Sequence, residues 1–265
     1  MLTRRSFSLL LTAGIILTSP LYSQWANYKT KSVPRFSNGK PNLAAPAPKS
    51  ADGKPDLSGL WILAGDPSDQ LDGLDHPPPK VALDLTTGLK PGDVEMMPSA
   101  AALFAKRLAN KGSCAPPGLP LSFTIPEPFK IIQTPGLITI LYEYSNSYRQ
   151  IFTDGRGLPG DPNPAYLGYS VAKWEGNTLI VETIGFNDKT QLDLFGHPHT
   201  ESLHMTERYV RRDFGHLDID ITIDDPKAYQ KPWTAKVGVE LYPDTDLIEF
   251  VCDENEKDFS HLAGK

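Results

Sequence analysis

Apolar and polar residues alternate most regularly near the end of the chain, where Leu and Ile alternate with Asp and Thr between Leu217 and Ile223. Successive side chains of a β-strand point to opposite faces, so this run predicts a strand with one buried and one solvated face. From Pro120 onwards, similar runs of β-branched and aromatic residues are separated by turn residues. They predict strands at 129–133, 137–144, 148–153, 167–174, 178–186, 203–211, 216–223, 234–241 and 247–252.

The spacing of these runs predicts an all-β fold. Residues 56–63 add a first strand ahead of the others, and Glu175-Gly176-Asn177 predicts a hairpin turn between two later ones. Successive hairpins can close into a barrel, and closure removes the exposed sheet edges. We therefore expect an antiparallel barrel of about eight to ten strands.

One helix is predicted, at residues 99–110. Ser99 can cap its start and Gly112 can end it, and the expected apolar face consists of Ala102, Leu103, Ala105, Leu108 and Ala109. We expect this helix to pack outside the barrel as a peripheral element.

Proline sets the domain organisation, since sixteen of the 25 prolines fall between Ser32 and Lys130. Proline removes a backbone donor that a central strand needs. Residues 24–53 are therefore predicted to form an extended Pro-rich lead-in, and residues 54–265 a single barrel domain with an insertion at 66–118.

The first residues resemble an export signal. Arg4 and Arg5 precede an uncharged apolar run that ends near Pro20, too short for a stable membrane anchor, and Ser23 suits the last position before cleavage. Residues 1–23 are thus predicted to be a cleaved signal peptide, which places the mature protein in the periplasm or outside the cell. The paired arginines resemble a twin-arginine signal, and the general secretory route stays open.

The net charge limits the possible binding partners, and the two cysteines predict a disulfide. The formal net charge is −6, and loss of Arg4 and Arg5 makes the mature chain more acidic, which argues against nucleic acid and anionic membranes as partners. The two cysteines, Cys114 and Cys252, are predicted to form a disulfide, as pairs in exported proteins commonly do. Oligomeric state is not predicted.

Two resemblances follow from short motifs. Gly59-Leu60-Trp61 resembles the Gly-x-Trp opening of lipocalin-like (calycin) barrels, and the segment from Trp174 to Val181 resembles a hairpin of the fatty-acid-binding class. Longer segments, Tyr148 to Arg156, Gly196 to His199 and Phe250 to Asn255, resemble a widespread group of exported bacterial proteins without an established activity. The first resemblance implies a lipocalin-like barrel, and the second implies export.

Three of the six histidines lie between Gly196 and His204. Residues two apart in an extended segment share a face, so His197, His199 and Glu201 could present two imidazoles and a carboxylate together, and His204 could complete or replace that set. Zinc, copper and iron favour such ligands. We predict a divalent transition metal at His197, His199 and His204. The alternative is an exposed histidine-rich loop without a cofactor.

Arginines suggest a second site. Arg149 and Arg156 could bind an anionic ligand through their guanidinium groups, with Asp154 beside them. A structural alternative is a strand that ends in an Asp-Gly turn with charges paired across neighbouring strands. Asp154 joins His204 and Glu201 as a candidate catalytic residue.

Two functions are the leading hypotheses, and a purely structural envelope protein is a third possibility. The chain has no serine-hydrolase elbow, phosphate-binding loop or dinucleotide fingerprint. The first hypothesis is an exported enzyme, a metal-dependent hydrolase, lyase or oxidoreductase, that acts on a small and partly apolar molecule. The second is a periplasmic carrier that holds a hydrophobic ligand in the barrel.

Overall fold

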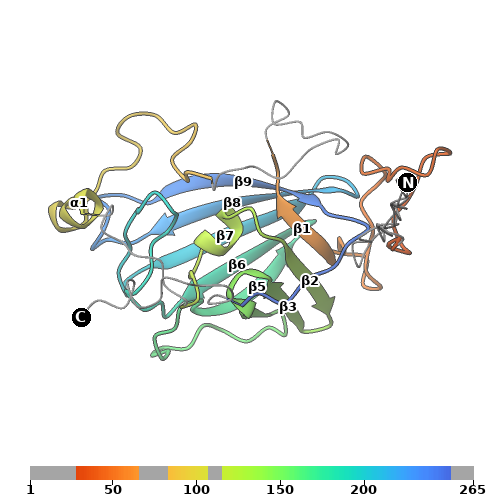
Figure 1. Ribbon diagram of the computed structural model, residues 1–265. Helices are drawn as coiled ribbons and strands as arrows, with labels where there is room; N and C mark the ends of the chain where they lie inside the picture. Colours follow the sequence, from red (N-terminus) through yellow and green to blue (C-terminus); the bar gives the residue numbers. More distant parts are fainter. Residues whose placement is uncertain (1–27, 66–82, 107–114, 252–265) are drawn as a thin grey trace, which may run out of the picture.

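Nine strands form a closed barrel in the computed structural model, which describes residues 28–65, 83–106 and 115–251 (Figure 1). Neighbours in sequence are neighbours in the barrel, and the last strand pairs with the first. The strands are β1 (Gly59–Leu63), β2 (Phe129–Thr134), β3 (Leu137–Tyr142), β4 (Tyr148–Phe152), β5 (Tyr169–Glu175), β6 (Thr178–Ile184), β7 (His204–Arg211), β8 (His216–Asp224) and β9 (Trp233–Leu241).

All neighbouring strands are antiparallel except β4 and β5, which are parallel. The strands of a closed ring with an odd number of members cannot alternate in direction at every step, so one pair of neighbours must run the same way. The β4–β5 pairing is short, with the register Ile151↔Ser170 and Phe152↔Val171. The all-β barrel is confirmed, and its expected antiparallel pattern is corrected at this one place.

The predicted alternation appears directly in β8. Leu217, Ile219, Ile221 and Ile223 are buried inside the barrel, while the residues between them are half-buried. Trp61 on β1 and Tyr209 on β7 are among the largest fully buried side chains of the same core. One apolar face on each strand therefore supplies the barrel interior, as the period of two requires.

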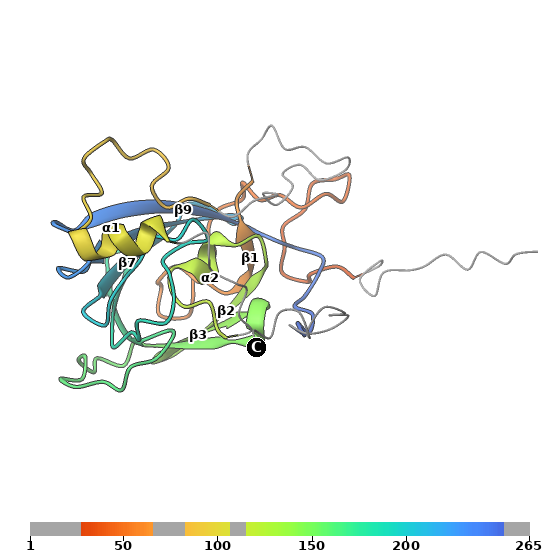
Figure 2. The same ribbon diagram turned by 60° about the vertical axis from the view of Figure 1, so that its left-hand side comes forward.

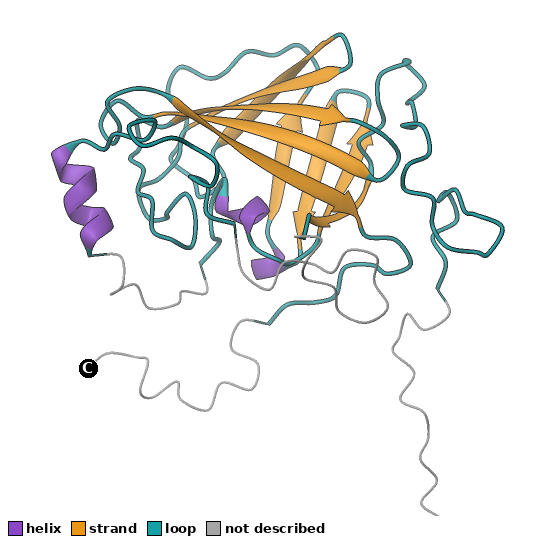
Figure 3. Ribbon diagram, turned by 90° about the horizontal axis from the view of Figure 1, so that it is seen from above, coloured by secondary structure: helices purple, strands orange, loops and turns teal. Residues whose placement is uncertain are grey.

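The two ends of the barrel differ. We call one the hairpin end, because the short β2–β3, β5–β6 and β7–β8 hairpins lie there. At the other, the loop end, lie the long β1–β2 and β6–β7 connections and the β8–β9 connection. The β1–β2 connection carries helices α1 (Pro98–Ala105) and α2 (Leu121–Thr124), and the β3–β4 connection holds the 3-10 helix η2 (Tyr144–Asn146). Figure 3 shows α1 standing beyond the strands at this end.

Helix α2 closes the interior from the loop end and lies within the ring of strands in Figure 2. Its Phe123 is 1 % exposed, and its ring lies 5.2 Å from that of Phe129, 5.6 Å from that of Tyr142 and 6.4 Å from that of Tyr209. These three aromatic residues come from β2, β3 and β7. Phe123 thus fills the space between opposite walls of the barrel.

Helix α1 differs from the predicted helix. It begins at Pro98, with Met97 rather than Ser99 as the N-cap, because the fixed φ of proline suits the first helical position. Its regular part ends at Ala105, and Ala100 is its buried residue, whereas Ala102, Leu103 and Ala105 are exposed. The predicted helical residues 107–110 lie outside the described part of the chain. The helix is peripheral, as expected, but the expected apolar face is not buried.

The described part of the predicted lead-in, residues 28–53, continues through residues 54–58 to β1. We call residues 28–58 the strap, and it runs along the hairpin end (orange in Figure 1). Arg35 forms an ion pair with Asp244, beyond the end of β9. The backbone N–H groups of Phe214 and Gly215, in the β7–β8 turn, donate to the carbonyls of Ala45 and Leu43 at 2.7 and 2.8 Å. A Cβ at Gly215 would lie 2.4 Å from the Leu43 side chain, so this close contact requires glycine.

The last predicted strand, 247–252, is wrong in its described part, since residues 247–251 are not a strand. The barrel is already closed by β1 and β9, so no open edge remains for another strand. The backbone N–H groups of Ile248 and Phe250 instead donate to the side chains of Glu143 and Asn146.

Two predictions fall on residues that the structure does not describe. The proposed signal peptide, residues 1–23, and both cysteines, Cys114 and Cys252, lie outside the described ranges. The predicted cleavage and disulfide therefore stay predictions. Among the described helices, none is both long enough and apolar enough to cross a membrane.

Candidate functional site

The β6–β7 connection gathers buried polar residues at the loop end. Asp193, His197 and His199 are each at most 5 % exposed. The turn that carries them is closed by the Leu192 N–H, which donates to the His197 carbonyl at 2.8 Å. Gly196, at φ 94°, provides the backbone conformation that the turn needs. The turn thereby folds His197 back onto Asp193.

Asp193 is the centre of this arrangement, and its side chain is fully buried. Its Oδ1 accepts the N–H groups of Phe195 at 3.0 Å and His197 at 3.2 Å. Its Oδ2 accepts the Leu85 N–H at 3.2 Å and lies 2.7 Å from Nδ1 of His197. These donors compensate the burial of the carboxylate and fix its orientation.

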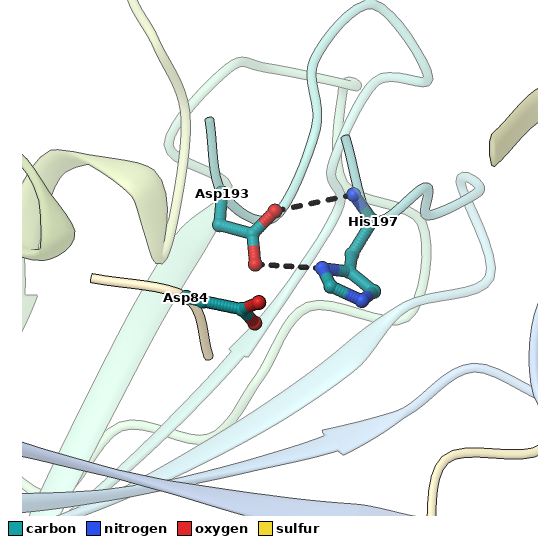
Figure 4. Close-up of side chains that lie close together, drawn as sticks. All are labelled: Asp84, Asp193 and His197. Atoms are coloured by element: carbon teal, nitrogen blue, oxygen red, sulfur yellow. Dashed lines mark hydrogen bonds and ion pairs between the residues drawn. The ribbon is translucent and has the colours of Figure 1, made fainter. Parts of the chain in front are cut away.

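His197 is held in one orientation by Asp193 (Figure 4). Because a carboxylate only accepts, Nδ1 carries a proton, and in the neutral imidazole Nε2 holds the lone pair. The described residues provide no hydrogen bond to Nε2. The ring lies 4.8 Å from that of Phe104 on α1 and 6.4 Å from that of Trp233 on β9. His197 is therefore an oriented imidazole in an aromatic setting.

Asp84 adds a second carboxylate (Figure 4). Its Oδ1 accepts the N–H and the hydroxyl of Thr86 at 2.8 and 2.7 Å. In the described part of the chain, Asp84, Asp193 and His197 are the one group of three acidic, cysteine or histidine residues whose ligand atoms all lie within 4.8 Å of one another. This group could hold a metal ion.

His199 is not part of that group. Its Nδ1 lies 3.3 Å from the Thr200 carbonyl, which can only accept, so Nδ1 donates there and the Thr190 hydroxyl donates to Nε2 at 2.8 Å. Burial lowers the pKa of His199, against smaller opposing effects of the hydrogen bond to Thr200 and of Asp225 and Asp188. Both ring nitrogens are thus occupied, and the neutral form is favoured.

His204 and Glu201 also lie apart from the Asp193–His197 pair. His204 begins β7 with 41 % of its side chain exposed, and its Nε2 lies 4.0 Å from Oε1 of Glu182 on β6. Glu201 lies in the exposed turn just before β7. The structure therefore joins His197 to acids that the sequence prediction did not include, rather than to His199, Glu201 and His204.

Arg149 points into the barrel and forms an ion pair with Glu207 on β7. Its other donors reach Ser170 at 3.0 Å and Thr183 at 2.8 Å, and the Tyr209 hydroxyl donates to Glu207 at 2.8 Å. Burial disfavours the charged guanidinium, but Glu207 more than compensates and raises the pKa of Arg149. Arg149 is thus a structural cation within the core.

Arg156 and Asp154 lie in the turn after β4, at the hairpin end, opposite to His197. The Arg156 guanidinium donates to both oxygens of Asp154, at 2.6 to 3.0 Å, and lies 3.8 Å from the centre of the Phe152 ring. The hydrogen bond from Arg156 lowers the pKa of Asp154. This pair lies in an Asp-Gly turn, as the structural alternative expects, but its charges pair within the turn and not across neighbouring strands. Arg156 does not converge with Arg149.

Sequence reasoning missed Asp84, Asp193 and Glu207. Asp193 lies four residues before His197, and Gly196 between them permits a tight turn. That spacing was an available signal for an Asp–His pair. The approach of Asp84 depends on the long β1–β2 connection and has no comparable local pattern.

Comparisons with protein-family models, curated proteins and solved structures found no match. The case for a function therefore rests on the geometry of the Asp193–His197 pair and its surroundings.

Proposed function

We propose that the protein is an exported enzyme that acts on a small, partly apolar molecule at the loop end, with His197 as its catalytic base. The observation that carries the proposal is the 2.7 Å contact between Nδ1 of His197 and the buried carboxylate of Asp193. A carboxylate that holds one ring nitrogen orients the imidazole and increases the basicity of the other nitrogen. Nε2 is then the atom that would take a proton from water or substrate.

The surroundings support this role. Trp233 is 4 % exposed, and its Nε1 has no hydrogen-bond partner among the described residues. Buried polar atoms without partners are uncommon in folded proteins. Trp233 is thus a buried aromatic neighbour of His197 with an unpaired N–H donor, and the Phe104 ring supplies an apolar contact.

A metal ion is an alternative role for His197, with zinc, copper or iron as candidates, because an Nε2 that binds a metal has no lone pair left to take a proton. In a tetrahedral zinc site with bonds of about 2.0–2.2 Å, two ligand atoms lie roughly 3.4 Å apart. Nδ1 of His197 and Oδ2 of Asp193 are closer, at 2.7 Å, as a hydrogen bond requires. In this alternative, Asp84 and His197 would hold the metal, and Asp193 would remain the group that orients the imidazole.

The carrier hypothesis has less support. A lipocalin-like carrier needs a cavity within the barrel. Phe123 occupies the interior between β2, β3 and β7 instead, and Arg149 and Glu207 fill a further part of it. An apolar ligand would have to displace packed aromatic rings or a buried ion pair.

Hydrolysis of small chromogenic esters by the mature protein tests the base. His197→Gln should lower kcat/KM by about 10²- to 10⁴-fold, the usual contribution of a general base. His204→Gln, which alters a half-exposed histidine outside the Asp193–His197 pair, is the matched control and should leave the rate near that of the wild type. Equal rates in the wild type and His197→Gln would refute the proposal.

Metal retention tests the alternative role of His197 as a metal ligand. After exposure to zinc, copper or iron and removal of excess ion, we expect about one equivalent to be retained. Asp84→Ala and His197→Ala should each abolish retention, whereas His199→Ala should not. If retention depends on His199 and His204 instead, the site first predicted from the sequence is correct.

A further inference from the structure

A groove of about 590 Å³ lies between the strap and the outer face of the barrel, at the hairpin end. Its apolar lining comes from both sides, with Phe36, Pro41 and Leu43 from the strap and Ile62, Tyr242 and Pro243 from the barrel side. Phe36 is 54 % exposed although it is large and apolar. The volume is within the usual range of small-molecule sites, about 300–1,000 Å³.

Two polar side chains converge in this groove. His216 begins β8 and lies opposite Glu240 of β9 in the strand register, and both line the groove. Nδ1 of His216 lies 2.6 Å from Oδ1 of Asp213, which also accepts the N–H groups of Gly215 and His216 at 3.1 and 2.9 Å. The carboxylate of Asp213 can only accept, so Nδ1 is the donor, and in the neutral imidazole Nε2 holds the lone pair.

Nε2 of His216 lies 3.7 Å from Oε1 of Glu240. This separation is too long for a direct hydrogen bond. In that form Nε2 of His216 and Oε1 of Glu240 are both acceptors, and neither donates a hydrogen bond to the other. The side chains of His216 and Glu240 are only 23 % and 16 % exposed, so bulk water satisfies them incompletely.

We infer that this groove binds a small apolar molecule that carries a hydrogen-bond donor, such as a phenol or an aromatic alcohol. The hydroxyl would be shared by Nε2 of His216 and Oε1 of Glu240, while the ring would lie against the apolar lining. An anionic ligand fits less well, because Glu240 would repel it. The other charged residues of the lining are Asp244, a second carboxylate that is paired with Arg35, and Lys40, a cation on the strap. Carboxylates therefore outnumber the lysine in the lining.

This site is independent of the proposed catalytic pair. His197 lies at the loop end, and His216 lies at the hairpin end. Both histidines are oriented by an aspartate through Nδ1, but the surroundings differ, since His216 faces a groove and a second carboxylate. The groove exists because the strap is fastened over β1 and β9, so ligand binding should also stabilise the strap.

Fluorescence titration of the full mature protein with two matched probes tests the inference. 2-Naphthol and 2-methoxynaphthalene share a ring system and differ in the hydroxyl donor. We expect 2-naphthol to bind at least tenfold more tightly, and 2-naphthoate to bind more weakly than 2-naphthol. Equal affinities for 2-naphthol and 2-methoxynaphthalene would overturn the inference.

The variant Glu240→Gln tests whether Glu240 and His216 cause the preference for 2-naphthol. The amide can donate to Nε2 of His216, which occupies the acceptor that the ligand would use. The preference for 2-naphthol should then fall to within about threefold, since a single lost hydrogen bond is worth roughly 0.5–1.5 kcal/mol. The matched control is Glu182→Gln, which alters a carboxylate that lies 4.0 Å from His204 without lining this groove. An unchanged preference in Glu240→Gln, with the thermal midpoint preserved, would overturn the inference.

Discussion

Arg149 on β4 and Glu207 on β7 form an ion pair through the interior of the barrel, and both side chains are at most 1 % exposed. Ser170 and Thr183 lie on the two strands between them and accept hydrogen bonds from the same guanidinium. The pair therefore links four consecutive strands across the parallel β4–β5 junction. A buried charge of this kind is tolerated because its partner and the hydroxyl groups replace the lost water.

Removal of one member of this pair should destabilise the fold strongly. Glu207→Gln leaves Arg149 buried without a counter-charge, so we expect a loss of about 3–5 kcal/mol in the free energy of unfolding, measured by denaturant titration. The matched control is Glu175→Gln, which affects an exposed ion pair with Lys173 and should cost under about 1 kcal/mol. Similar losses in both variants would contradict the structural role of Arg149.

His199 should make stability depend on acidity. Its folded-state pKa is lowered by burial, so the unfolded chain binds a proton more readily. As pH falls below the ordinary histidine value of 6.5 and approaches the lowered one, protonation favours unfolding, and stability should drop. His199→Gln should flatten this part of the curve of unfolding free energy against pH. His204→Gln is the control, and an equal effect of the two variants would contradict the assignment.

Arg211 should hold the strap in place. Its guanidinium donates to the carbonyls of Asp56, Ser58 and Phe214 and stacks 4.8 Å from the Trp61 ring. Burial lowers the pKa of Arg211 to about 10, so it stays charged at neutral pH. Arg211→Met should increase hydrogen exchange at the N–H groups of Phe214 and Gly215, which bond to the strap.

The neighbouring residue provides the control for that experiment. Arg212→Met removes a mostly exposed ion pair with Asp218 and should leave exchange at Phe214 and Gly215 unchanged. If Arg211→Met also leaves it unchanged, the strap is held by other contacts, such as the ion pair between Arg35 and Asp244.

Export remains to be tested on the natural precursor. The basic start and apolar run predict removal of residues 1–23, so protein recovered from the periplasm should begin at Gln24 by mass spectrometry. Replacement of Arg4 and Arg5 by lysine should block export through the twin-arginine route. Undiminished export of that variant would assign the signal to the general secretory route, and an intact Met1 would contradict cleavage.

Local patterns predicted most of the barrel. The alternation in β8 and the Gly176 turn between β5 and β6 depend on residues close in sequence, and both predictions are confirmed. The parallel β4–β5 pair could not be predicted in this way, because it follows from how many strands the closed ring contains. The strand wrongly predicted at 247–252 also reflects the closure of the barrel. Its sequence suits a strand, but β1 and β9 already pair, so its described residues 247–251 have no partner strand.

The candidate site was predicted less well. An extended segment would have placed His197 and His199 on one side, but the turn at Gly196 and the hydrogen bonds of Asp193 set their orientations separately. Thr190 and Thr200 then occupy both nitrogens of His199. Asp84 reaches His197 only through tertiary packing. Residue types in the sequence suggested the chemistry, and the long connections determined which residues meet.

The single parallel pair divides the barrel into two continuous sheets. Strands β1 to β4 form one antiparallel meander and β5 to β9 form another, joined through residues 153–168. The closed ring is thus equivalent to two halves that meet along two seams, β4–β5 and β9–β1. Arg149 belongs to the first half and Glu207 to the second, so their ion pair joins the two halves inside the barrel. A cut within residues 153–168 would leave these halves as separate chains.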